Sequence, residues 1–322
     1  MTNQIIITEP HGLAYIRQPA LDENPFVVYI TGLSSEHSKR NMKRHLNFIA
    51  GLLTNGQCNA LEIHWGGLRY VHTAWIRGEL LNRYPNPATV NMMLSALRGV
   101  LQEAWRLGHM SAEHYHRAID INNVEGSAIP AGRDLNAGEI GALVNSCADG
   151  SKAGQRDAAI IGLLYSCGLR RSEVVKLNVA DFEPGTGKLK IISAKGRKDR
   201  TVYAQGGALD ALLDWMHIRT WQAGALFTPI LKNDKIVIRH LTPQTVYDIL
   251  MARGKRIGLE TFTVHDFRRT FVGDSLERGV DIATVANIAG HANVDTTRRY
   301  DRRPEETKRE AAAKLHYPYK KR

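Results

Sequence analysis

The sequence predicts a mainly α-helical protein with one small β-sheet, in which a helical N-terminal bundle precedes an α+β domain. Apolar residues recur at helical spacing through most of the 322 residues, and one pair of short segments has strand character. The stretch 122–134, Asn-Asn-Val-Glu-Gly-Ser-Ala-Ile-Pro-Ala-Gly-Arg-Asp, has the composition of a linker. The predicted division is an irregular segment 1–20, a helical domain 21–124, a linker 125–134 and a second domain 135–322.

Four helices are expected in the N-terminal domain. The segment before them is expected to be irregular, because prolines interrupt it at Pro10, Pro19 and Pro25. Ser34 or Ser35 can cap the first helix. Its apolar face includes Met42, Leu46, Ile49 and Leu53, and its polar face carries Lys39, Arg40, Lys43 and Arg44. The other three helices are expected at about 69–82, from Pro87 to Gly108, and at about 111–121.

The second domain is predicted to be mostly helical. One helix begins after Asn136, and an apolar helix at 156–167 ends at Gly168. The segments 189–193 and 200–203 predict a β-hairpin around Ala-Lys-Gly-Arg-Lys-Asp. Further helices are expected at about 207–222, 243–257, 264–278, 282–289 and 305–315.

Charge is the first indication of function. The net charge is +11, from 43 Lys and Arg against 32 Asp and Glu. Residues 1–125 hold 11 basic and 10 acidic side chains, whereas residues 126–322 hold 32 and 22, so the second part carries nearly all of the excess. This predicts a polyanionic partner, with nucleic acid first and an anionic membrane surface second.

Composition also excludes several classes of protein. No run of about 18 apolar residues predicts a membrane span, and no secretory signal is evident at the N-terminus. The three cysteines, Cys58, Cys147 and Cys167, lie far apart without metal-type spacing. We therefore expect a reducing, cytoplasmic setting.

Two basic segments in the second domain could carry chemistry. In Cys167-Gly-Leu-Arg-Arg-Ser-Glu-Val, Arg170 and Glu173 share a face if Arg170 opens a helix, so the carboxylate can orient the guanidinium. In the hairpin turn, Lys195 precedes Arg197 and Lys198, and a lysine at a turn tip can reach a phosphate. The ordinary alternatives are a surface ion pair and a solvated basic turn.

Two further segments contain histidine. His265 and Arg268 are three residues apart on a predicted helix, so an imidazole that handles a proton lies beside a guanidinium that neutralises charge. After the predicted helix end at Gly290, a loop brings His291 back toward Tyr300. Taken singly, His265 is more simply explained by a capped helix start, and Tyr300 by a packed or surface tyrosine.

Taken together and in this order, the motifs Gly-Leu-Arg-x-x-Glu, the turn lysine, His-x-x-Arg and Gly-His followed by Tyr nine residues later resemble the tyrosine recombinases, the phage integrase family. The resemblance covers about 133–322, and the N-terminal bundle resembles the family's core-binding, SAM-like domain. The sequence departs from the family's usual motif at two positions: Phe267 stands where Leu is common, and Arg269 stands where His is frequent. Neither removes a reacting group.

The resemblance implies a role for each motif residue. Tyr300 would be the nucleophile that forms a 3′-phosphotyrosyl link and frees a 5′-hydroxyl. Arg170 and Arg268 would clamp the non-bridging phosphate oxygens. Lys195 would protonate the departing 5′-oxygen, and His265 would accept a proton near the tyrosine. His291 would donate a hydrogen bond to the phosphate, and Glu173 would hold Arg170 in place.

The resemblance also implies partners. We expect a site-specific recombinase of a mobile element or chromosome, monomeric in solution, that forms a homotetramer on two inverted-repeat core sites in duplex DNA and works through a Holliday junction. No metal or other cofactor is expected, and accessory proteins are possible. Helix 305–315 could dock on a neighbouring subunit or pack in cis. The expected DNA contacts are Lys39, Arg40, Lys43, Arg44, Arg197 and Lys198.

Two other functions stay open at this point. A type IB topoisomerase-like relaxase would use the same residues without a partner site. A non-catalytic DNA-binding protein could have the same fold, although the presence of all six reacting side chains argues against it.

Overall fold

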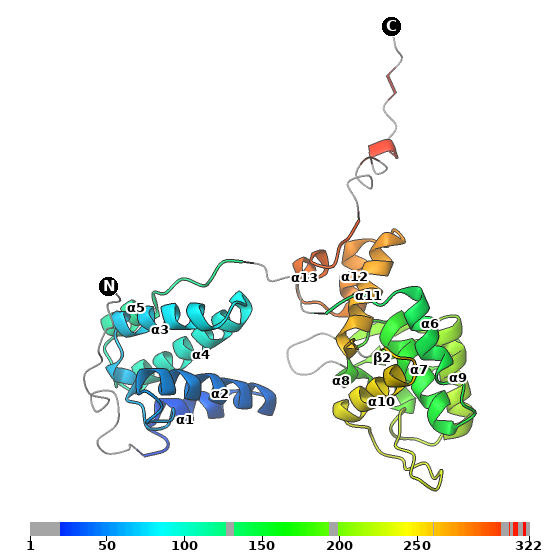
Figure 1. Ribbon diagram of the computed structural model, residues 1–322, viewed down its shortest axis with the longest axis horizontal. Coiled ribbons are helices and arrows are strands. Elements are labelled where there is room, and N and C mark those ends of the chain that lie inside the picture. The colour runs from blue at the N-terminus through cyan, green and yellow to red at the C-terminus, as the bar shows by residue number, and fades with distance from the viewer. Residues whose placement is uncertain are drawn as a thin grey trace. The chain divides into compact units, whose positions relative to one another are not determined.

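The computed structural model describes residues 20–126, 132–192, 199–259 and 261–303, with 309, 312–314 and 318–319. The chain divides into two units, Met1–Ile129 and Pro130–Arg322, and Figure 1 shows the elements of each. None of the helices in these ranges is both long and apolar enough to cross a membrane.

The first unit contains five α-helices within its described residues, one more than predicted. They are α1 Pro25–Gly32, α2 Glu36–Leu53, α3 Tyr70–Arg83, α4 Pro87–Arg106 and α5 Ala112–Ile119, with a short 3-10 helix at Trp65–Gly67. The expectation of an irregular chain around Pro25 was wrong. Pro25 is the first residue of α1, where its missing N–H costs nothing, and the Asn24 side chain accepts a hydrogen bond from Phe26 N.

Helix α4 is the centre of the first unit and packs against α1, α2, α3 and α5. Its buried face repeats at helical spacing through Leu94, Leu97 and Leu101, which are fully buried. Ser35 caps α2 by accepting a hydrogen bond from Ser38 N, one of the two caps that the sequence predicted.

The second unit is helical with one small sheet. Its α-helices are α6 Ala137–Asn145, α7 Lys152–Ser166, α8 Arg171–Val174, α9 Gly207–Arg219, α10 Pro243–Arg256, α11 Val264–Glu277, α12 Ile282–Ala289 and α13 Val294–Arg298. A 3-10 helix spans Val179–Asp181. The predicted helix at 305–315 lies mostly outside the described residues.

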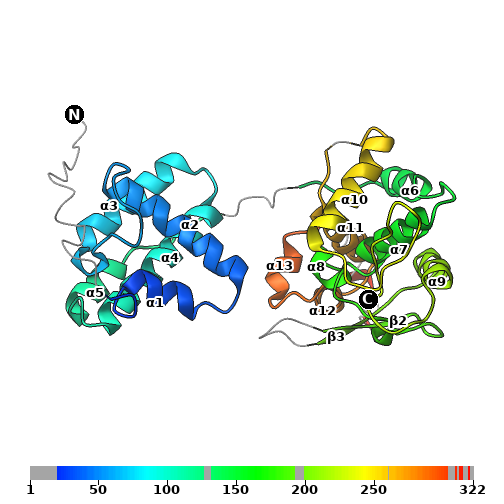
Figure 2. The ribbon, with the colours of Figure 1, turned by 90° about the horizontal axis from the view of Figure 1, so that it is seen from below.

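The sheet is antiparallel, in the order β1 Phe182–Glu183, β2 Lys188–Ile191 and β3 Arg200–Tyr203. Strands β2 and β3 form the predicted hairpin, with Leu189 opposite Val202, and Figure 2 shows them side by side. The turn residues 193–198 lie outside the described residues. The two-residue strand β1 is too short to leave an alternating pattern in the sequence.

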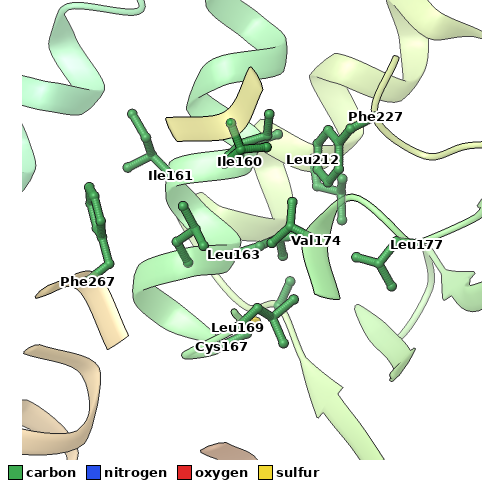
Figure 3. Packing of buried hydrophobic residues seen from close by; sticks show 14 of the residues in the cluster. Ile160, Ile161, Leu163, Cys167, Leu169, Val174, Leu177, Leu212, Phe227 and Phe267 are labelled. Carbon is green, nitrogen blue, oxygen red and sulfur yellow. The ribbon is translucent and has the colours of Figure 1, made fainter. Parts of the chain in front are cut away.

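The hydrophobic core of the second unit surrounds α7. Ile160 and Leu163 of α7 are fully buried and belong to the same cluster as Leu212 of α9 and Phe267 of α11 (Figure 3). Val174 of α8 is also fully buried in this cluster. The core therefore anchors α8, which carries Glu173, and α11, which carries His265 and Arg268.

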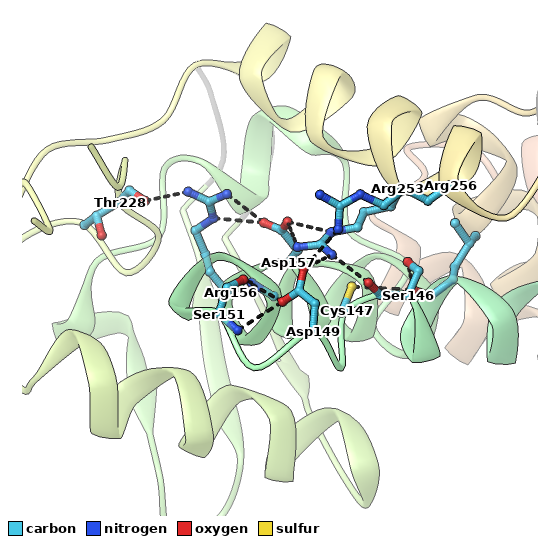
Figure 4. Close-up of polar contacts among 11 residues, drawn as sticks. Ser146, Cys147, Asp149, Ser151, Arg156, Asp157, Thr228, Arg253 and Arg256 are labelled. Atoms are coloured by element: carbon cyan, nitrogen blue, oxygen red, sulfur yellow. Dashed lines mark hydrogen bonds and ion pairs between the residues drawn. The ribbon is translucent and has the colours of Figure 1, made fainter. Parts of the chain in front are cut away.

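A buried ion network joins α7 to α10 (Figure 4). One oxygen of Asp157 accepts hydrogen bonds from Arg156, and the other accepts hydrogen bonds from Arg253 Nε at 2.9 Å and Nη2 at 2.8 Å. Arg253 Nη1 also lies 2.7 Å from Asp149 Oδ2. Because buried charges are tolerated only when they are paired, this network fixes the relative position of the two helices.

Candidate active site

Residues from segments far apart in the sequence meet around α8, α11 and the α12–α13 loop. Arg170, His265 and Arg268 line one pocket of about 470 Å³. Arg170 Nη2 donates to the carbonyl of Gly290, next to His291, at 3.1 Å. Lys195, Arg197 and Lys198 belong to 193–198, outside the described residues, so their predicted roles stay predictions.

Glu173 holds two arginines at this site. Its Oε1 accepts a hydrogen bond from Arg170 Nη1 at 2.8 Å, and its two oxygens pair with Arg200 Nη1 at 3.0 Å and Nη2 at 2.8 Å. Burial alone would raise the pKa of Glu173, but hydrogen bonds from Arg200 and the Arg170 backbone lower it to about 2. The carboxylate therefore stays ionised and fixes the Arg170 side chain.

The chain folds locally to make this pair. Arg170 is the N-cap of α8, and the Glu173 side chain returns to the Arg170 backbone N–H at 2.9 Å as a capping box. Arg200 was missed by the sequence analysis, which placed it only in a strand. Its Nε also donates to the carbonyl of Ile288 at 2.7 Å, which ties β3 to α12. No local signal could reveal these contacts, because both partners are distant in the sequence.

Arg268 is buried and incompletely paired. Its side chain is 2% exposed, and Nη1 donates to the carbonyl of Gly168 at 2.6 Å. Across the described ranges, no atom accepts a hydrogen bond from its buried Nη2. Burial and the charge of Arg170 lower the pKa of Arg268 to about 9, so the guanidinium remains charged at pH 7. A buried cation with an unpaired donor is suited to an anionic oxygen.

His291 directly follows Gly290, the residue that ends α12, and this position accommodates glycine better than residues with a side chain. Gly290 closes α12 in the left-handed region with φ of 64°, and a β-carbon there would lie 2.9 Å from Arg200 Nη1. The His291 Nδ1 lies 2.8 Å from the hydroxyl of the buried Thr297. Burial, then the charges of Arg268 and Arg170, lower the pKa of His291 to about 4, so the ring is neutral at pH 7.

The hydroxyl of Tyr300 lies 3.4 Å from His265 Nε2. The tyrosine follows Arg299, the C-cap of α13, and its backbone N–H donates to the carbonyl of Thr297 at 2.9 Å. Partial loss of solvent and the charge of Arg268 lower the pKa of His265 below its usual range. A neutral imidazole at this distance can accept the phenolic proton.

The arrangement of these side chains suits one type of chemistry. Arg268 and Arg170 supply positive charge beside a tyrosine hydroxyl that has a proton acceptor. Such a site can bind a phosphate ester and promote attack on it by the phenolic oxygen. Within the described residues, no group of three or more His, Cys, Asp or Glu side chains could hold a metal ion.

The predicted DNA contacts of the first unit lie on α2. Arg40, Lys43 and Arg44 are exposed. Lys39 is partly buried, and its Nζ lies 2.9 Å from Glu36 Oε1. Three of the four cations therefore face solvent, whereas Lys39 already has a carboxylate partner.

The sequence of this chain is similar to those of known proteins. Residues 133–306 match the model of the phage integrase family, which is more than half of the chain. The chain is 35% identical to tyrosine recombinase XerA of Pyrococcus furiosus over 147 residues, which cover 46% of this chain and 50% of that protein. It is 28% identical to tyrosine recombinase XerC of Alcanivorax borkumensis over 285 residues, which cover 84% and 87%. The match thus spans about half the length of the first curated relatives.

Solved structures share the fold. The Tn1549 transposon integrase, in complex with a circular intermediate DNA, superimposes with a TM-score of 0.69 at 14% identity, covering 92% of this chain and 99% of that one. The XerH site-specific recombinase, bound to a palindromic difH substrate, gives a TM-score of 0.63 at 18% identity, covering 91% and 95%. The likeness in fold therefore extends beyond the residues that match the family model.

Proposed function

Since the chain belongs to the phage integrase family of tyrosine recombinases, we propose that it is a site-specific DNA recombinase that cuts and rejoins duplex DNA through a 3′-phosphotyrosyl intermediate. The observation that carries this proposal is the 3.4 Å approach of the Tyr300 hydroxyl to His265 Nε2, beside the unpaired buried donor of Arg268.

In the proposed reaction, the Tyr300 oxygen bonds to phosphorus while the bond from phosphorus to the 5′-oxygen breaks. His265 takes the phenolic proton, and its lowered pKa keeps it neutral and ready to do so. Arg170 and Arg268 hold the non-bridging oxygens and stabilise the added negative charge of the transition state. Loss of one such hydrogen-bond donor is expected to slow DNA cleavage by about 10²- to 10³-fold.

Two further residues complete the proposed chemistry. The proposed tautomer of the neutral His291 has its proton on Nε2, so that Nδ1 accepts from the Thr297 hydroxyl 2.8 Å away and Nε2 donates to a phosphate oxygen. Lys195, outside the described residues, is proposed from the sequence as the acid that protonates the 5′-oxygen. Attack of a 5′-hydroxyl on the phosphotyrosine reverses the steps, so rejoining consumes no nucleotide and needs no metal.

The proposed substrate is duplex DNA with inverted-repeat core sites. Support comes from the net charge of +11, the exposed cations of α2 and the DNA complexes among the structures that share the fold. We also propose that the protein assembles as a tetramer on two sites, exchanges DNA strands through a Holliday junction and acts in the bacterial cytoplasm. Whether helix 305–315 docks on a neighbour or in cis stays a prediction.

The test begins with a binding selection from duplexes that carry randomised inverted repeats. A plasmid with two copies of the selected site is then incubated with the protein, and recombinant circles are the expected product. A matched supercoiled plasmid that lacks the site is the control. Relaxation of that control without recombinants would identify a relaxase. Binding without any cleavage would identify a DNA-binding protein that does not cut.

A further inference from the structure

Two arginines that flank Tyr300 share one carboxylate. The guanidinium carbon of Arg269 lies 5.8 Å from the centroid of the Tyr300 ring, and its Nε lies 3.2 Å from Asp134 Oδ1. Arg302, two residues after the tyrosine, places Nη1 2.8 Å from Asp134 Oδ2. Each oxygen of Asp134 thus holds one arginine. We name Asp134, Arg269 and Arg302 the Asp134 clamp.

Arg302 is 36% exposed but pairs with two further carboxylates besides Asp134. Its Nε lies 3.3 Å from Glu277 Oε1 and its Nη2 lies 3.4 Å from Asp274 Oδ1, both on α11. A β-carbon at Gly273, also on α11, would overlap the Arg302 guanidinium, and the nearest atoms to that position all belong to Arg302. The absence of a side chain at Gly273 therefore makes the seat for Arg302.

Tyr300 needs support from outside its own helix. It follows α13, a helix of five residues, and helices this short have little stability of their own. On the N-terminal side, Thr297 contacts His291 and the Tyr300 backbone. On the C-terminal side, Asp301 contacts Arg298 and Arg303 of its own segment, whereas Arg302 ties that segment to α11 and to Asp134.

We propose that the Asp134 clamp positions Tyr300 for attack, with Arg269 restraining the ring and Arg302 restraining the chain that follows. The clamp residues act through Tyr300, so they are positioning residues rather than catalytic ones. Asp134 lies at the start of the second unit, more than 160 residues before the tyrosine, so no local sequence pattern reveals the link. This inference rests on the function proposed above.

The sharpest test is Gly273→Ala. Alanine favours a helix more than glycine does, so α11 itself is not weakened, but the new methyl group displaces the Arg302 guanidinium. We expect a melting temperature at or above that of the wild type, together with single-turnover cleavage of a nicked suicide substrate that is slower by about 10- to 100-fold. A loss of fold would lower both quantities together.

Two charge variants test the same clamp independently. Asp134→Asn, which keeps the size of the side chain, and Arg302→Gln, which shortens it, each break the Asp134–Arg302 ion pair, and each is expected to slow cleavage by about tenfold or more. Arg303→Gln is the matched control. Arg303 is the next residue along the chain and pairs with Asp301 at 2.7 Å rather than with the clamp. It is expected to cleave within about twofold of the wild type.

A second readout separates positioning of the tyrosine from damage to the phosphate site. In a Tyr300→Phe background, hydrogen peroxide serves as the nucleophile toward the same phosphorus, and this attack does not need Tyr300 to be placed. Adding Asp134→Asn, Arg302→Gln or Gly273→Ala is expected to leave the peroxide-dependent cleavage and the Kd for DNA unchanged within about twofold.

The outcomes are distinct. If the wild type forms no covalent adduct, the proposed function fails. If the wild type forms the adduct and the three clamp variants cleave at the wild-type rate, the clamp inference fails. It fails as well if peroxide-dependent cleavage falls as far as tyrosine-dependent cleavage, because the variants would then act on the phosphate site.

Discussion

Glu173 and Arg200 form a two-point ion pair, with Oε1 3.0 Å from Nη1 and Oε2 2.8 Å from Nη2. The same carboxylate binds Arg170 at 2.8 Å, and Arg200 also binds the carbonyl of Ile288. One arginine of the β-hairpin therefore supports the Arg170 side chain and the end of α12 that precedes Gly290. The site depends on this pair for its shape as well as for its charge.

Replacement of Glu173 by Gln is expected to be strongly destabilising. It leaves Arg200, whose side chain is 6% exposed, without its carboxylate, and breaking a buried pair costs about 3–5 kcal/mol. Urea denaturation measures the free energy of unfolding. The control is Glu36→Gln, which breaks the exposed Lys39–Glu36 pair and should cost below about 1 kcal/mol. Equal losses in the two variants would contradict the structural role of Glu173.

The rate of DNA cleavage is expected to fall with acidification below the usual range of histidine. His265 must be neutral to accept the phenolic proton, and its pKa lies below 6.5, so the rate stays level as the pH drops to 6.5. Below the lowered pKa, the rate should drop about tenfold per pH unit. Single-turnover cleavage across this range measures the profile. An acid limb that begins above pH 6.5, or that persists in His265→Gln, would contradict the assignment.

Gly290→Ala is expected to impair both folding and cleavage. The φ of 64° disfavours alanine by about 1–2 kcal/mol, and the methyl group presses on the Arg200 guanidinium. The matched control is Gly279→Ala, because Gly279 has φ of 84° but no atom within 4 Å of the added carbon. Both variants should have a lower melting temperature than the wild type. Only Gly290→Ala should slow cleavage by more than its loss of stability explains. Identical cleavage rates would show that Arg200 does not depend on Gly290.

The exposed cations of α2 are expected to contribute to DNA affinity through counterion release. Replacing Arg40, Lys43 and Arg44 together by Gln should reduce the slope of log K against log salt by about 3. The measurement is a binding titration at several salt concentrations. An equal change of charge at Arg83, Arg106 and Arg117, each already paired with a glutamate, is the control and should leave the slope nearly unchanged. A larger change of slope in the control variant than in the α2 variant would show that the DNA contact does not lie on α2.

Regular elements were the part of the fold that sequence patterns predicted well. Helix α12 begins and ends where its pattern predicts, and β3 matches the predicted second arm of the hairpin. Helix α1 was missed because Pro25 was treated as an interruption, although proline is also a common first residue of a helix. Short elements and proline-started helices carry too little periodicity to be assigned from one sequence.

Within the candidate site, the contact between Arg170 and Glu173 was predictable because the two residues lie within one helix turn. Arg200, Thr297 and Asp134 were missed because each contacts a partner that only the folded chain brings close. The side chains of these three residues are common in solvated positions, so residue type alone gave no signal. Arg269 was noted only as a departure from the family pattern, and its pairing with Asp134 gives that departure a physical context.

The most direct measurement is the identity of the side chain that becomes attached to DNA. The wild-type protein is incubated with a nicked suicide substrate, the trapped adduct is digested with protease and nuclease, and the modified peptide is sequenced by mass spectrometry. The predicted result is a 3′-phosphate on Tyr300, with no adduct from Tyr300→Phe although that variant still binds the DNA. An adduct on any other side chain, or one that persists in Tyr300→Phe, would contradict the account.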